Sequence, residues 1–252
     1  VTGVQTCALP IFSAQSTHRW LPWLLLTPQL VIVLVFFFWP ASQALFQSVL
    51  LEDAFGASRE FVGLDNFKSL WRDPTYWGSF STTAVFSVLV ASIGLSLSLL
   101  LAVCANRVTN SRFWGAGFYK TLLITPYAVA PVVAAVLWMF LFNSSFGVMT
   151  YVLRALGVDW NYTLNGTHAM SLIVGAAVWK QVSYNFLFFL AGLQSIPRSL
   201  IEAASLDGAS PWKRFWTITF PLLTPTTFFL LVINIVYAFF DTFAIVDATT
   251  HG

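Results

Sequence analysis

The sequence predicts an all-α, polytopic membrane protein. Hydrophobic residues make up 58% of the 252-residue chain and charged residues only 9%. Because soluble domains carry about 25% charged residues, this chain lacks the polar surface that water requires. Its apolar residues gather in runs of about twenty or more, the length of helix that crosses a bilayer. These runs place five spans at about residues 21–49, 80–105, 119–142, 169–193 and 222–246.

The N-terminal segment is excluded from this prediction. Residues 1–12 resemble translated adaptor sequence, and their apolar part is too short for a signal peptide. We expect them to be non-native, with the authentic chain starting near Ser13. Residues 13–252 are then expected to form a single transmembrane domain.

The first span begins and ends among aromatic residues of the kind that favour a membrane–water interface, and these are Trp20, Trp23 and Trp39. Pro28 and Pro40 are expected to bend this span. A polar segment follows at residues 51–78. Its Val62–Phe67 stretch is predicted to form a turn that leads into a short amphipathic helix.

The next two spans differ in composition. The second is rich in Ser and Gly, and such small residues let membrane helices pack closely, so we expect it to be buried among others. The third contains Pro126 and Pro131. Prolines free backbone carbonyls, and they are tolerated in a membrane where neighbouring groups or water satisfy those carbonyls. Residues 143–167 are predicted to form a second polar loop.

A polar island at residues 195–221 separates the last two spans. Ser195 is predicted to cap a first short helix, because its hydroxyl suits the exposed N–H groups of a helix start. Gly208 is predicted to end that helix by adopting positive φ. Ser210 is predicted to cap a second helix, and Pro221 to close it.

The distribution of Lys and Arg predicts a cytoplasmic N-terminus and a cytoplasmic island. Seven basic residues would then lie on the inside, namely Arg19, Arg107, Arg112, Lys120, Arg198, Lys213 and Arg214. Four would lie in the outer loops, namely Arg59, Lys68, Arg72 and Arg154.

Two charges fall within the predicted spans. Lys180 lies near the middle of the fourth span, where a charge costs about 2.5–3.5 kcal/mol on insertion scales. Asp241 on the fifth span lies at a similar depth. Either the two form a structural ion pair, or Lys180 lines the transport path and attracts an anionic substrate. The residues predicted to line that path are Lys180, Gln181, Tyr184, Asn185, Asn234, Tyr237 and Asp241.

Other kinds of chemistry find little support in the sequence. His18, His168 and His251 form no cluster, so neither a catalytic nor a metal site is predicted. Cys7 and Cys104 are not expected to form a disulfide. The sequence holds no Gly-x-x-x-x-Gly-Lys-Ser/Thr motif, so we expect it to bind neither ATP nor another cofactor. A net charge of +2 gives no reason to expect nucleic acid as a partner.

The island resembles the EAA loop of the inner-membrane permeases of ATP-binding-cassette (ABC) importers. The matching residues are Ile196-Pro197, Leu200, Glu202-Ala203-Ala204, Asp207-Gly208-Ala209, Phe215, Ile218 and Pro221, while Phe220 replaces the usual leucine. The resemblance implies the type I importer permease fold (MetI-like) in a bacterial inner membrane. That family has six spans, so the sixth is expected to be missing by C-terminal truncation. The resemblance further implies that an ATPase is coupled through Glu202, Ala203, Ala204, Asp207, Gly208 and Pro221.

Further stretches are similar to the permease subfamily of sn-glycerol-3-phosphate importers, and they are Arg19–Pro22, Phe61–Phe67, Pro126–Pro131, Trp179–Gln181, Tyr184–Phe189 and Tyr237–Phe243. This similarity implies a non-catalytic pore subunit that moves sn-glycerol-3-phosphate or glycerophosphodiesters. It also implies three kinds of partner, apart from membrane lipid. These are a second permease forming a heterodimer, two ATP-binding subunits that hydrolyse ATP, and a periplasmic substrate-binding protein.

Alternatives to this interpretation stay open. A permease of the same family could carry a neutral sugar or oligosaccharide. A secondary transporter would usually show inverted repeats or acid relays, and neither is evident in the sequence. A membrane enzyme would need a nucleophile with a base, or a metal cluster, and the sequence suggests neither.

Overall fold

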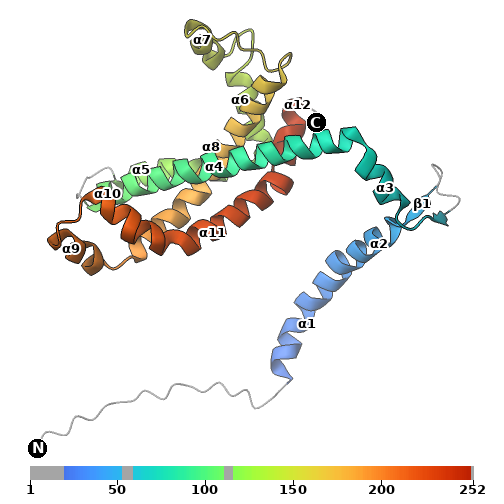
Figure 1. Cartoon of the computed structure of the whole chain (residues 1–252), viewed down its shortest axis with the longest axis horizontal. Coiled ribbons are helices and arrows are strands. Elements are labelled where there is room, and N and C mark those ends of the chain that lie inside the picture. The colour runs from blue at the N-terminus through green and yellow to red at the C-terminus, as the bar shows by residue number, and fades with distance from the viewer. Residues whose placement is uncertain (1–19, 53–58, 111–115, 251–252) are drawn as a thin grey trace, which may run out of the picture. The chain divides into compact units, whose positions relative to one another are not determined.

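The computed structural model describes residues 20–52, 59–110 and 116–250 (Figure 1). The predictions for residues 1–12 and for Cys7 lie outside these ranges. The regular elements of the described residues are helices except for one two-stranded hairpin, which the sequence did not predict. It divides into two units, residues 1–77 and 78–252, and each is described by itself. Four described helices are long and apolar enough to cross a membrane, and a bent helix pair provides a fifth candidate.

The first span is one apolar rod made of α1 (Leu21–Val33), a π-helical turn η1 (Leu34–Phe38) and α2 (Trp39–Gln47). The π turn directly precedes Pro40, which lacks the N–H that would continue the helix. Trp39 N–H donates instead to the Leu34 carbonyl five residues back, so the ladder passes the proline without a break.

A β-hairpin follows this rod and consists of β1 (Leu50–Glu52) and β2 (Arg59–Phe61). The strands are antiparallel, with Leu51 opposite Glu60. An ion pair links the last residue of β1 to the first residue of β2, because Arg59 Nη2 lies 2.9 Å from Glu52 Oε1.

The predicted amphipathic helix is confirmed as α3 (Asp65–Arg72). Gly63 adopts a φ of +61° and turns the chain toward it. Asn66 then fastens the helix to the preceding segment, since its Nδ2 donates to the Ser48 carbonyl at 3.0 Å and the Leu50 carbonyl at 2.9 Å.

The second span, α4 (Pro74–Asn110), is longer at both ends than the predicted residues 80–105. One face of its later part is buried, as its small residues predicted. Ser98 is fully buried and its hydroxyl donates to the Gly94 carbonyl. A Cβ on Gly94 would lie 3.5 Å from Asn234 Oδ1, so the glycine allows a polar side chain of another helix to approach the backbone.

The third span is broken rather than straight. It consists of α5 (Ala116–Ile124), the 3₁₀ turn η2 (Thr125–Ala128) and α6 (Pro131–Leu141). The helices on the two sides of the break differ in direction by 103°. Pro131 explains the break, because a proline disfavours helical backbone in the residue before it. Ala130 accordingly has a ψ of 142°.

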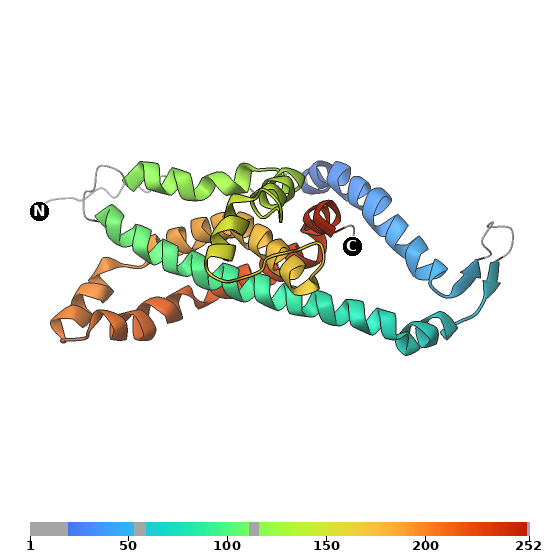
Figure 2. The same ribbon diagram turned by 90° about the horizontal axis from the view of Figure 1, so that it is seen from above.

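The fourth span, α8 (Gly166–Ser195), is the central helix of the second unit. Figure 2 shows it beside α5 and α11. Two glycines bring neighbours close to its backbone. A Cβ on Gly175 would lie 2.5 Å from the Trp138 ring of α6, and one on Gly192 would lie 2.8 Å from Leu223 of α11.

The loop at residues 143–167 is more ordered than a polar loop suggests. It contains a short helix, α7 (Val148–Ala155), which the sequence analysis did not predict. Trp160 anchors the loop: it is 7% exposed, and its Nε1 donates to the Phe142 carbonyl at 3.1 Å. Its ring stacks on His168, with 4.8 Å between the ring centroids.

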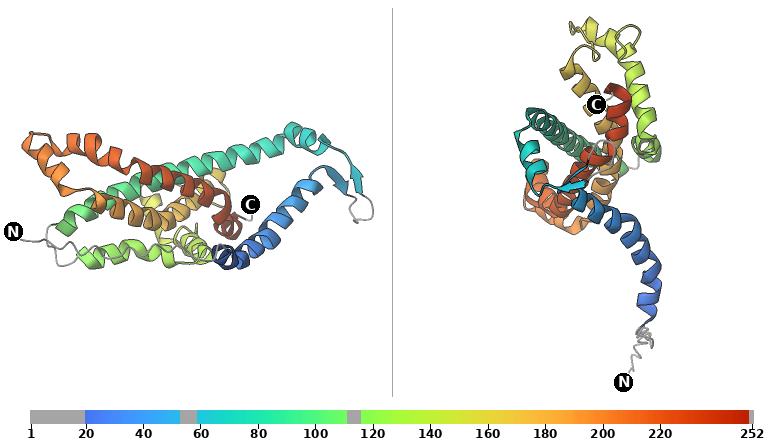
Figure 3. Two further views of the ribbon diagram at one scale, coloured as in Figure 1. Left: turned by 90° about the horizontal axis from the view of Figure 1, so that it is seen from below. Right: turned by 90° about the vertical axis from the view of Figure 1, so that its right-hand side faces the viewer.

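The last span differs from its predicted range. The helical rod begins at Pro211 and continues to Asp241, and a separate helix α12 (Phe243–Thr250) packs against α6. Within the rod, α11 (Phe220–Val236) is followed by the π turn η4 (Tyr237–Asp241). Figure 3 shows α12 at the end of the rod that is remote from α9.

Gly175 provides a test of this packing. Gly175→Ala should destabilise the protein by about 1–3 kcal/mol, the usual cost of overpacking, because the new methyl group would overlap the rigid Trp138 ring. The measurement is thermal unfolding of the detergent-solubilised protein. Gly166→Ala is the matched control, since a Cβ at Gly166 meets nothing within 4 Å. Equal melting temperatures for the two variants would contradict the packing of α6 on α8.

Candidate coupling loop and membrane cavity

The first helix of the island, α9 (Arg198–Leu206), ends in a Schellman motif. Gly208 has a φ of +76°, as predicted, and its N–H donates to the Ser205 carbonyl at 3.2 Å. Ala209 N–H donates to the Ala204 carbonyl at 3.0 Å. These two bonds satisfy carbonyls at the helix end, so the turn has a defined geometry despite its exposure.

The predicted cap at the start of α9 is wrong. Ser195 is the last residue of α8, and its hydroxyl donates to the Gly192 carbonyl at 2.8 Å. Pro197 occupies the cap position of α9. The reason is the restriction that a proline places on the residue before it: Ile196 has a ψ of 123° and Pro197 a ψ of 126°, so α9 begins only after both.

The second helix, α10 (Pro211–Arg214), begins as predicted, because Ser210 Oγ accepts from Lys213 N–H at 3.3 Å. The prediction that Pro221 closes this helix is wrong. A π turn, η3 (Phe215–Thr219), leads directly into α11, and Phe220 N–H donates to the Phe215 carbonyl five residues back. As at the first span, the wider turn accommodates the proline without ending the helix.

The helices α9 and α10, with the turn at Gly208 between them, form an elbow. Most residues predicted to couple to an ATPase are exposed on it or next to it. Glu202, Ala203, Asp207, Gly208 and Pro221 are exposed, and Ala204 is half-buried. Leu206, next to Asp207 at the end of α9, is 90% exposed.

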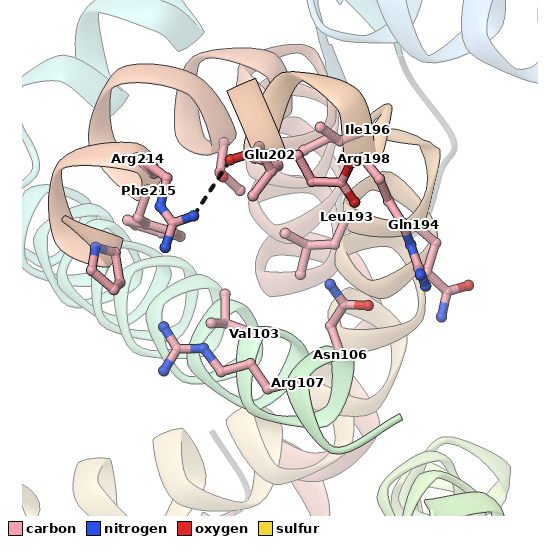
Figure 4. Close-up of a pocket in the computed structure, with 13 residues that line it drawn as sticks. Val103, Asn106, Arg107, Leu193, Gln194, Ile196, Arg198, Glu202, Arg214 and Phe215 are labelled. Carbon is pink, nitrogen blue, oxygen red and sulfur yellow. Dashed lines mark hydrogen bonds between the residues drawn. The ribbon is translucent and has the colours of Figure 1, made fainter. Parts of the chain in front are cut away.

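A cleft of about 780 Å³ lies between the elbow and the ends of α4 and α8 (Figure 4). Arg214 holds the two arms of the elbow together, since its Nη1 donates to the Ile201 carbonyl of α9 at 3.4 Å. The full lining is Val103, Asn106, Arg107, Leu193, Gln194, Ile196, Arg198, Ile201, Glu202, Pro211, Arg214, Phe215 and Thr219.

A second cavity, of about 510 Å³, lies at the break in the third span. Five of the predicted substrate-path residues line it, namely Lys180, Gln181, Tyr184, Tyr237 and Asp241. Tyr127, Pro131 and Ile233 complete the lining and were missed by the sequence analysis. Pro126 and Pro131 could have pointed to Tyr127 and Pro131, because a helix broken by proline must contact groups that satisfy its free carbonyls.

Lys180 makes its closest polar contact with that break. Its Nζ donates to the Tyr127 carbonyl at 3.3 Å and lies 5.5 Å from the centroid of the Tyr127 ring. No ion pair joins Lys180 to Asp241 in this part of the described chain, although both line the same cavity. The structural ion pair considered from the sequence is therefore not formed, because Lys180 reaches the carbonyl of the bent helix instead.

Asn185 and Asn234 lie apart from the cavity lining. Both are fully buried, and their side-chain amides bond each other, with N–O distances of 3.1 and 2.8 Å. Asn234 Nδ2 also donates to the Leu230 carbonyl at 2.7 Å. This geometry suits a polar link between α8 and α11, and a role for the two residues on the substrate path stays a prediction.

Known proteins resemble the chain along most of its length. Residues 94–250 match the family described as "Binding-protein-dependent transport system inner membrane component". The sn-glycerol-3-phosphate transport system permease protein UgpA of Agrobacterium fabrum is 58% identical over 235 residues, which cover 93% of this chain and 79% of the relative. The protein of the same description from Rhizobium meliloti is 59% identical with the same coverage.

Solved structures support the same assignment of fold. A bacterial ABC transporter that imports the acidic polysaccharide alginate matches with a TM-score of 0.70 and 24% identity, covering 91% of this chain and 82% of the other. The alginate transporter in complex with its pentasaccharide-bound periplasmic protein matches with a TM-score of 0.71 and 25% identity, over 90% and 80% of the two chains. The chain therefore belongs to the family of inner-membrane permease components of binding-protein-dependent transport systems, and it has the MetI-like permease fold of ABC importers.

Proposed function

We propose that this permease carries sn-glycerol-3-phosphate or glycerophosphodiesters across the bacterial inner membrane. Relatives at 58–59% identity that are described as sn-glycerol-3-phosphate transport system permeases support the first of these substrates. The structural observation that carries the proposal is the position of Lys180, whose ammonium group lies at the wall of a membrane cavity. Its hydrogen bond goes to a neutral carbonyl, so no direct contact with a carboxylate cancels its charge.

Such an ammonium group can bind a phosphate strongly. Hydrogen bonds between ionised partners are about twice as strong as neutral ones, and a weakly solvated cavity strengthens the attraction further. Removing Lys180 from water costs free energy, and an anionic ligand would recover part of it. The hydroxyl of Tyr184 and the amide of Gln181 lie on the same cavity wall and suit the hydroxyl groups of a glycerol moiety.

The energy for transport would come from partner subunits. In this proposal a second permease completes the pore, two ATP-binding subunits dock on the elbow, and a periplasmic binding protein delivers the substrate. The N-terminus lies in the cytoplasm. The chain binds no cofactor itself, because it lacks a phosphate-binding glycine loop. ATP binding to the partners would bias the pore through its different affinity for the two pore states.

A neutral sugar is the second candidate substrate. The rings of Tyr127 and Tyr184 pack with centroids 5.6 Å apart and both line the cavity. Aromatic surfaces of this kind suit the apolar face of a sugar. Lys180 favours the phosphate ester, since a neutral ligand would leave its ammonium group without a direct ionic contact, even though Asp241 lines the same cavity.

Replacement of Lys180 separates these candidates. Lys180→Met should reduce uptake of sn-glycerol-3-phosphate at least tenfold, because a charged hydrogen bond contributes about 1.5–3 kcal/mol. Lys180→Arg, which keeps the charge, should retain most of the uptake. The measurement is binding-protein-dependent uptake into proteoliposomes with equal amounts of inserted transporter. Unchanged uptake in the methionine variant would argue for a neutral substrate.

Gly208 tests the coupling role of the elbow. Gly208→Asp places a side chain on a residue with φ of +76°, so it should distort the end of α9 and abolish ATP-driven uptake while the protein stays in the membrane. Gly157→Asp is the matched control: Gly157 also has positive φ, at +84°, and open space around it, but it lies in the loop after α7. Vanadate should block uptake by the wild type.

If Gly208→Asp keeps ATP-driven uptake, or if Gly157→Asp loses it equally, the elbow has no specific coupling role. Uptake that resists vanadate and follows an ion gradient would favour a secondary transporter instead.

A further inference from the structure

The cleft behind the elbow is strongly basic. Guanidinium groups reach it from three elements, with Arg107 on α4, Arg198 on α9 and Arg214 on α10. Figure 4 shows the guanidinium groups of Arg107 and Arg214 on the same side of the cleft. Glu202 is the one acid among its lining residues. Three cations around one acid leave an excess of positive charge in a space of about 780 Å³.

We propose that this cleft binds the phosphodiester headgroup of an anionic phospholipid. The inference rests on the membrane placement of the elbow given above, but not on which substrate the permease carries. Arginine is well suited to the task, because its planar fork of N–H donors matches phosphate oxygens in two-point contacts. Basic pockets between membrane helices on the cytoplasmic side are known to hold such headgroups.

The walls of the cleft favour a lipid over a free phosphate ion. Val103 lies one turn before Arg107 on α4, and Leu193 lies next to Gln194 on α8, so apolar side chains line the cleft on the side of the spans. Ile196, further along the same wall, continues this surface. A free anion gains nothing from apolar contact, whereas the glycerol backbone and first acyl carbons of a lipid would cover it.

The surroundings place the cleft at the depth of lipid headgroups. Trp212 and Trp216, on the turns beside Arg214, are 72% and 46% exposed. Exposed tryptophans are typical of the membrane–water interface, where one part of the ring is in lipid and the other is wet. Arg107 lies in the last turn of the long span α4, which also ends at this level.

A bound headgroup would join two parts of the fold. Arg107 belongs to a span, while Arg214 belongs to the elbow and already holds the α9 backbone. A phosphate between them would tie the elbow to α4 and limit its movement away from the membrane. Lipid composition would thereby set the position of the proposed coupling surface.

Native mass spectrometry of the purified complex with its ATPase tests the proposal. Dioleoyl phosphatidylglycerol, dioleoyl phosphatidylcholine and inorganic phosphate are the probes. Wild-type complex should retain phosphatidylglycerol in preference to phosphatidylcholine. The phosphatidylglycerol concentration needed for half-saturation should rise about fivefold in each of the variants Arg107→Gln and Arg214→Gln. Arg72→Gln, which removes a charge on α3, should bind as the wild type does.

A second measurement needs no variant. Photoactivatable phosphatidylglycerol should cross-link to the end of α4 or to the elbow in the wild type. Equal retention of the two lipids, cross-links confined to other segments, or displacement of the lipid by inorganic phosphate would each overturn the proposal. None of these measurements involves uptake, so a failure here leaves the proposed transport function standing, and a failure of uptake leaves the lipid site standing.

Discussion

Hydrocarbon offers a polypeptide no hydrogen bonds, so each backbone group inside the membrane must find its partner within the protein. This constraint explains how the chain accommodates three of its prolines. At Pro40 and Pro221 a preceding π turn shifts the ladder to bonds over five residues, and the helix continues. At Pro131 the chain breaks instead, and the freed carbonyl of Tyr127 receives the ammonium group of Lys180. The carbonyl left free at the break and the half-buried ammonium group of Lys180 therefore satisfy each other.

The second unit is held together around α8, and small residues make its contacts possible. Gly175 and Gly192 let α6 and α11 approach its backbone, and Gly94 of α4 leaves room for the bonded pair of Asn185 and Asn234. Helices in lipid gain little from the hydrophobic effect between themselves, so close packing and interhelical hydrogen bonds must supply their association. A buried pair of amides that bond each other fixes both the rotation of α8 and α11 about their axes and their relative depth in the membrane.

Much of this architecture follows from local sequence, and the failures have physical causes. Span positions follow from the length of apolar runs, and the turn at Gly208 follows from its freedom to adopt positive φ. Contacts between spans were harder to predict. Residue counting gives the depth of Lys180 and Asp241 but not the rotation of their helices, so the direction of Lys180 toward Tyr127 could not be deduced. The cap at Ser195 failed because the restriction imposed by a proline on its predecessor outweighed the capping preference.

The cavity and the elbow are joined by two uninterrupted helical rods. From Lys180 to Ser195, α8 has no break, and at about 1.5 Å per residue it spans about 22 Å. From the other arm of the elbow, a continuous helix runs from Pro211 to Asp241, and its last π turn carries both Tyr237 and Asp241 into the cavity wall. Because helical rods resist compression, a tilt of the elbow would displace the walls that these rods contribute. The wall that contains Tyr127 belongs to neither rod, since Tyr127 lies in the turn just before the break in the third span. A tilt would therefore change the distance between Lys180 and the Tyr127 carbonyl, which is the contact that an anionic substrate would have to replace.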